Sequence, residues 1–71
     1  MQNSNQIKWQ PLSADELSAV SGLTGLDGTL KQMEFSFISD VVDKLESYGE
    51  LGANFTIKQR SWIKRLAIKY L

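Results

Sequence analysis

Five cations stand close together in the last seventeen residues, FTIKQRSWIKRLAIKYL, and no acidic residue accompanies them. They are Lys58, Arg60, Lys64, Arg65 and Lys69. Lysine and arginine bind phosphate groups, and an aromatic ring set among them can stack on an unpaired base. The segment therefore predicts a surface for single-stranded nucleic acid, although the whole chain is formally neutral.

On a helix these residues separate into two flanks, because an α-helix advances 1.5 Å and turns about 100° per residue. One flank carries a row about 17 Å long, which consists of Lys58, Trp62, Arg65 and Lys69. Arg60 and Lys64 fall on the opposite flank. In this arrangement the cations would hold phosphates, and Trp62 or Tyr70 would stack on a base.

Purely structural roles compete with this interpretation. Trp62 also has the phase of a core residue, and aromatic side chains dominate small cores. The cations could form a solvated face or pair with the acidic side of the second helix, but exposed ion pairs contribute only about 0–1 kcal/mol each. The three cations near the end of the helix favour its macrodipole, whereas Lys58 and Arg60 in the first turn oppose it. Helix stability therefore does not explain Lys58 and Arg60, which favours a binding role for them.

The composition removes several kinds of catalytic chemistry. The 71 residues include no cysteine and no histidine, which excludes disulfides, thiol chemistry and the commonest metal ligand. Asp40, Asp43 and Glu46 lie on a predicted exposed face without a neighbouring base, so they do not indicate a catalytic or metal site. The glycine triplet in SGLTGLDG imitates a phosphate loop, but no strand precedes it and no G-K-[ST] closes it. We expect a non-catalytic protein without a cofactor or a metal.

Three capping-box patterns mark where helices should begin. The pairs are Ser13–Glu16, Thr29–Gln32 and Thr56–Gln59. Gly22 and Gly49 suit the ends of the first two helices, and apolar residues recur every three or four positions between these signals. The predicted helices are about 14–21, 30–48 and 57–70.

The absence of an alternating strand pattern and the short links predict an all-α, three-helix domain over residues 11–71. Residues 1–10 are mostly polar, so we expect a flexible N-terminal arm that Trp9 could pin. The inward face of the second helix is predicted to hold Leu30, Phe37, Ile38, Val41, Leu45 and Tyr48. The buried stripe of the third should hold Trp62, Ile63, Leu66, Ala67 and Tyr70, which leaves three apolar residues outside it: Ile57, Ile68 and Leu71.

The stretch FISDVVDKLESYGELGANFTIKQRSWIKRLAIKYL resembles a small helical module of bacteriophage DNA-metabolism proteins, the C-terminal domain of the UvsW recombination helicases of T-even phages. The shared pattern is an apolar helix, a glycine turn, a Thr-x-Lys-Gln start and a tryptophan helix. These positions are Gly49, Thr56, Lys58, Gln59 and Trp62, and the likeness covers about residues 36–71. It implies binding of single-stranded DNA during recombination, replication or repair. Any helicase activity would then belong to a partner or a larger parent protein.

We therefore expect a phage accessory domain that binds single-stranded nucleic acid, DNA in preference. One alternative is a module that docks a phage or host protein through its acidic second helix or through Ile57, Ile68 and Leu71. Charge segregation supports such docking, because residues 1–50 carry three cations and eight carboxylates. Another is a basic amphipathic helix at a membrane surface. No apolar stretch reaches the roughly 20 residues of a membrane span and no signal peptide is expected, so a cytoplasmic location in the infected host is predicted.

Overall fold

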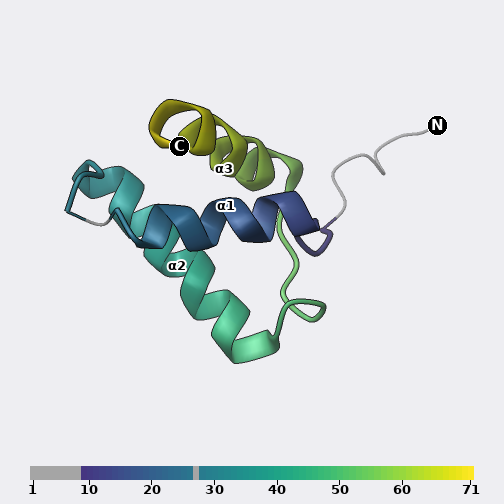
Figure 1. The fold of residues 1–71 in the computed structure, drawn as a ribbon. Coiled ribbons are helices and arrows are strands. Elements are labelled where there is room, and N and C mark those ends of the chain that lie inside the picture. The colour runs from purple at the N-terminus through teal and green to yellow at the C-terminus, as the bar shows by residue number, and fades with distance from the viewer. Residues whose placement is uncertain (1–8, 27) are drawn as a thin grey trace.

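The computed structural model describes residues 9–26 and 28–71, which form three helices and no extended strand. The helices are α1 (Ala14–Thr24), α2 (Gln32–Tyr48) and α3 (Ile57–Tyr70). Figure 1 shows α1 running between the other two, and α1 packs against both of them. The prediction of an all-α, three-helix domain is confirmed. Residues 1–8 of the predicted arm lie outside the described part of the chain.

Local capping interactions start α1 and α3 at the predicted residues. The Ser13 hydroxyl accepts a hydrogen bond from the Glu16 N–H at 3.2 Å, and the Glu16 carboxylate accepts one from the Ser13 N–H at 2.8 Å. Thr56 and Gln59 repeat this exchange at 3.1 and 2.9 Å. Each box satisfies two backbone donors that a helix start would leave unpaired.

The start predicted for α2 at Thr29 and Gln32 is wrong. Leu30 is buried before the helix begins, and α2 opens at Gln32 with Lys31 as its cap residue. The Lys31 N–H donates to the Glu34 carboxylate at 2.9 Å. Only one half of a capping box is formed, because the lysine side chain has no acceptor for the Glu34 N–H.

The end predicted for α1 at Gly22 is also wrong, since the helix continues to Thr24. A methyl group at Gly22 would lie only 3.0 Å from Leu71 Cδ1. This glycine therefore permits close approach of the chain end to α1 and does not terminate the helix. Gly49, in contrast, ends α2 as predicted, with a positive φ (+83°) that glycine adopts at low cost.

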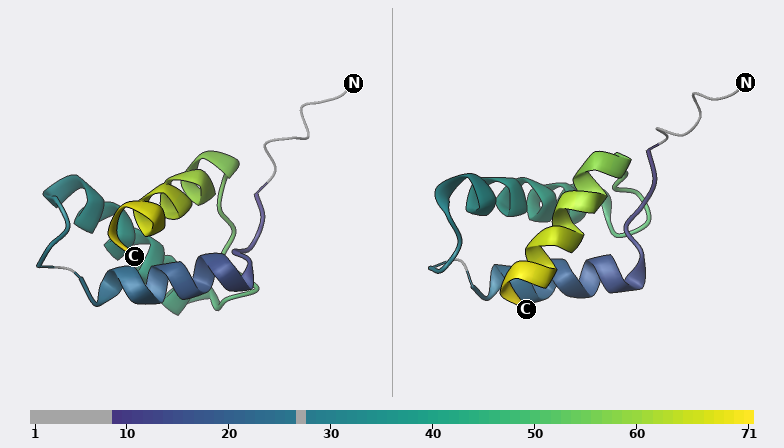
Figure 2. Two further views of the ribbon diagram at one scale, coloured as in Figure 1. Left: turned by 45° about the horizontal axis from the view of Figure 1, so that its top comes forward. Right: turned by 90° about the horizontal axis from the view of Figure 1, so that it is seen from above.

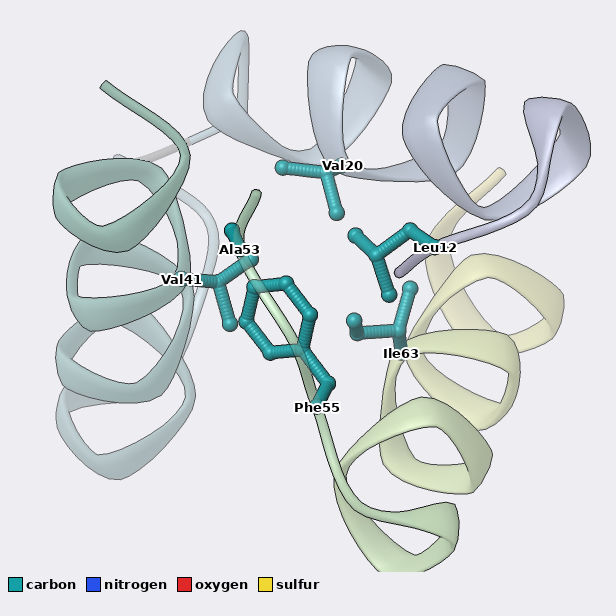
Figure 3. Close-up of a cluster of buried hydrophobic side chains, with 6 residues drawn as sticks. All are labelled: Leu12, Val20, Val41, Ala53, Phe55 and Ile63. Atoms are coloured by element: carbon teal, nitrogen blue, oxygen red, sulfur yellow. The ribbon is translucent and has the colours of Figure 1, made fainter. Parts of the chain in front are cut away.

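The core forms where three helices meet the link between α2 and α3 (Figure 3). One buried cluster consists of Leu12, Val20, Val41, Ala53, Phe55 and Ile63. A second consists of Leu23, Leu30, Ile38 and Leu66. Figure 2 shows α3 crossing α1, so that their facing sides close both clusters. Tyr48 was predicted to face inward but is 66% exposed, because the last turn of α2 runs beyond α1 (Figure 1).

The link after α2 is a structural element that periodicity does not reveal. The sequence predicts only a short link here, but Ala53 and Phe55 are almost completely buried. Phe55 also exchanges two backbone hydrogen bonds with Gln10, at 3.0 and 2.8 Å. Trp9 stays 58% exposed with the Lys44 ammonium 4.8 Å from its ring. The ordered domain therefore includes Trp9 and Gln10, which the sequence had placed in the arm.

Phe55→Ala should destabilise the domain by about 3–5 kcal/mol, because the substitution opens a cavity between all three helices. Leu51→Ala is the matched control, since Leu51 belongs to the same link but is 86% exposed. Urea unfolding followed by circular dichroism measures both variants. Equal losses of stability in the two variants would contradict the assigned role of Phe55.

Candidate nucleic-acid interface

The predicted binding residues all lie on α3, and the structure divides them into two groups. Three of the five cations form ion pairs with carboxylates of the other helices: Arg60, Lys64 and Lys69. The other two, Lys58 and Arg65, precede and follow Trp62 on one flank of α3 and have no ion-pair partner within the described residues. The long row predicted along one flank is therefore shorter in the folded protein.

Glu16 is the partner of Arg60 and Lys64. This residue is 1% exposed, and the Arg60 Nε lies 3.0 and 3.2 Å from the two carboxylate oxygens. The Lys64 ammonium lies 3.4 Å away. Arg60 also donates to the side chain of Gln10 at 2.8 Å. The position of Arg60 in the first turn, which helix stability did not explain, is explained by this buried carboxylate of α1.

Glu34 holds the other end of α3 in the same way. Its carboxylate accepts hydrogen bonds from the Tyr70 hydroxyl at 2.6 Å and from the Lys69 ammonium at 3.0 Å. The Lys31 N–H completes the set. Lys69 and Tyr70, which were candidates for phosphate binding and base stacking, are therefore engaged with the start of α2.

These contacts shift the pKa values of the two carboxylates, Glu16 and Glu34, and of Lys69 and Tyr70. Burial raises the pKa of Glu16, but hydrogen bonds from Ser13 and Arg60, with Lys64 nearby, outweigh it, so the net pKa is lowered. The hydrogen bond from Tyr70, together with that from Lys31, lowers the pKa of Glu34 to about 2. The same carboxylate raises the pKa of Lys69 and of Tyr70.

A hollow of about 390 Å³ remains on the Trp62 flank of α3, lined by Lys58, Ser61, Trp62 and Arg65. Trp62 is half-buried, and Phe37 of α2 stacks on its ring with centroids 4.1 Å apart and planes 22° from parallel. Trp62 thus belongs to the packing between helices and also borders the hollow. The two roles considered for it are compatible in this geometry.

The carboxylates that pair with α3 are not those of the acidic face on α2. Asp40, Asp43 and Glu46 are exposed and form none of the ion pairs. A sequence signal for the true partners exists, because each opens an apolar stripe at i, i+4 and i+7. These stripes are Glu16–Val20–Leu23 and Glu34–Ile38–Val41, and all six residues are buried. A carboxylate in phase with a buried stripe predicts a cation from another element.

The described residues 9–26 and 28–71 hold no cluster of three or more carboxylates with the geometry of a metal site. None of the three helices has both the length and the apolar composition needed to cross a membrane. Comparison with protein-family models, with curated proteins and with solved structures finds no match. The resemblance of residues 36–71 to a phage DNA-metabolism module therefore stays a prediction.

Arg60→Gln should destabilise the protein by about 1.5–3 kcal/mol, because it removes hydrogen bonds to a charged, buried group. Lys58→Gln, the same kind of change two residues earlier on the opposite flank of α3, should alter stability by less than about 0.5 kcal/mol. Urea midpoints of the two variants test this difference. Equal destabilisation would mean that Glu16 does not depend on Arg60.

Stability should fall as pH decreases from about 4.5, the ordinary pKa, toward 2. The folded state holds the Glu34 carboxylate ionised in this window, whereas the unfolded chain takes up a proton. Glu34→Gln should flatten the pH dependence measured by urea unfolding at several pH values. Asp40→Asn, which removes an exposed carboxylate from α2, should keep the slope of the parent. A Glu34→Gln variant with the parent's slope would contradict this assignment.

Proposed function

We propose that this protein binds single-stranded nucleic acid, DNA in preference, at the hollow beside Trp62. The observation that carries the proposal is the placement of Lys58 and Arg65 on either side of a half-buried indole ring. Phosphates can take the two charges while a base stacks on the indole, as in proteins that bind single strands without a strict sequence code. The preference for DNA rests on the resemblance of residues 36–71.

The distribution of charge sets the expected strength of binding. Arg60, Lys64 and Lys69 pair with carboxylates of α1 and α2, so we expect two phosphate contacts, from Lys58 and Arg65. Each contact on a single strand contributes about 0.7 to the slope of log affinity against log salt, which gives a slope near −1.4. This corresponds to weak binding that suits an accessory domain.

In this proposal the domain is non-catalytic and supports recombination, replication or repair. Any helicase activity would lie in a partner or a larger parent protein. The proposed phage origin and location in the host cytoplasm rest on the same resemblance.

A second candidate is docking to another phage or host protein. The observation that favours it is the exposure of large apolar side chains on the outward side of α3: Ile68 is 85% exposed and Leu71 is 63% exposed. A shallow hollow between α1 and α3 adjoins Ile68 and is lined in part by Ala19 and Ala67. Apolar docking should persist at high salt, whereas phosphate binding should not.

The double substitution Lys58→Gln with Arg65→Gln should abolish most of the salt dependence of binding. The parent should lose about 7-fold in affinity for a single-stranded oligonucleotide of about 12 nucleotides when salt rises fourfold. The double variant should bind more weakly and lose less than about 2-fold, because no phosphate contact remains in the hollow. Fluorescence anisotropy of a labelled oligonucleotide at several salt concentrations measures both.

The matched control is Lys31→Gln with Lys44→Gln, which makes the same change in net charge away from the hollow. It should keep the slope of the parent. If the double variant in the hollow also keeps that slope, this site does not bind the strand. If a protein partner binds α3 with no dependence on salt, the docking candidate replaces the proposal.

A further inference from the structure

We infer that the hollow accepts one unstacked base and its two flanking phosphates, with the base adding a third ring to the Phe37–Trp62 stack. This inference rests on the proposed function and narrows its ligand to a single unpaired nucleotide step, with purines preferred. The length of single strand in contact with the protein should therefore be much shorter than α3.

Buried core residues support the Phe37–Trp62 stack. Phe37 packs against both buried clusters, and Trp62 packs against the cluster formed by Leu23, Leu30, Ile38 and Leu66. The two rings come from different helices and lie nearly parallel. A ring fixed by such packing loses little conformational freedom when a ligand binds, so more of the stacking energy appears as affinity.

The two cations are spaced for one nucleotide step. Lys58 lies four residues before Trp62 and Arg65 lies three residues after it. At 1.5 Å per residue the two cations are about 10 Å apart along the helix axis, with the indole between them. Flexible side chains at this separation can reach the phosphates on the two sides of one base. Ser61, which also lines the hollow, offers a hydroxyl to the edge of that base.

The same folding contacts prevent a longer footprint. Lys69 would extend the row by one turn, but its ammonium lies 3.0 Å from Glu34. Arg60 and Lys64 are drawn to Glu16 on the opposite flank. A second phosphate-binding step along α3 is therefore missing from the described residues. A duplex is a poor ligand, because extracting a base from its stack costs a few kcal/mol.

A purine should be preferred to a pyrimidine at this site. Preferences of single-strand sites of this kind follow the strength of stacking, and a two-ring base covers more of the indole. Phe37 is a positioning residue in this arrangement, because it contacts Trp62 and not the hollow.

The experiment uses the full chain with Trp9→Phe, so that fluorescence reports Trp62 alone. Deoxyadenosine oligomers of about 1, 3, 6 and 12 nucleotides are titrated. The expected result is quenching of Trp62 fluorescence by every oligomer of three or more nucleotides. A longer oligomer offers more equivalent bases to the site, and its affinity should exceed that of the trimer only by this statistical factor. A trimer with an abasic centre should bind about 5- to 150-fold more weakly, the loss expected for one stacked base.

Two variants separate stacking from charge. Phe37→Leu should weaken the trimer and reduce quenching while leaving the salt slope unchanged, and Phe37→Tyr should restore both. Lys58→Gln should flatten the salt slope while quenching at saturation remains. A Phe37 variant that changed only the melting temperature would show a merely structural role and would overturn the assignment of this residue.

The outcomes distinguish this inference from the proposed function. Affinity that rises from 3 to about 12 nucleotides by more than the statistical factor would contradict the single-base site. An abasic trimer that binds as well as the intact trimer would contradict it too. Either result leaves the proposed binding of single strands unaffected. If no oligomer of any length binds, both are wrong.

Discussion

The buried carboxylate of Glu16 is the constraint on which the arrangement of the helices depends. A carboxylate that is 1% exposed must keep charged partners, because an unpaired buried charge costs several kcal/mol. Arg60 and Lys64 supply these charges and the Ser13 N–H donates a hydrogen bond, so a single side chain starts α1 and holds the first turns of α3. Glu34 repeats this at the far end of α3 through Lys69 and Tyr70.

These two anchor points determine which side of α3 faces water. Since both flanks of the helix are tied to carboxylates, its rotation about its own axis is set, and Lys58 and Arg65 are left without such partners beside Trp62. A helix that carries five cations in the sequence thus presents a smaller charge in the fold. The proposed ligand follows from this reduction, because two charges and one supported ring suit a short piece of single strand.

The link between α2 and α3 completes the core that supports this surface. Phe55 occupies the centre of one buried cluster (Figure 3), and its backbone pairs with Gln10 just before α1. A chain of 71 residues buries a small core, so a loop residue of this size carries a large share of the packing. The stacked Phe37 and Trp62 border that packing, which makes the hollow a product of the core and not of α3 alone.

The three helices, the boxes at Ser13 and Thr56 and the turn at Gly49 can be predicted from the amino-acid sequence, because these features depend on hydrogen bonds and periodicity within a few residues. Which cations lack an ion-pair partner depends on the packing of the helices, since Arg60 contacts a residue 44 positions away and Lys69 contacts one 35 positions away. The burial of Phe55 also depends on contacts with residues that are distant in the sequence. The phase of Glu16 and Glu34 on their helices predicts that each has a cationic partner, but which cation it is depends on how the helices cross.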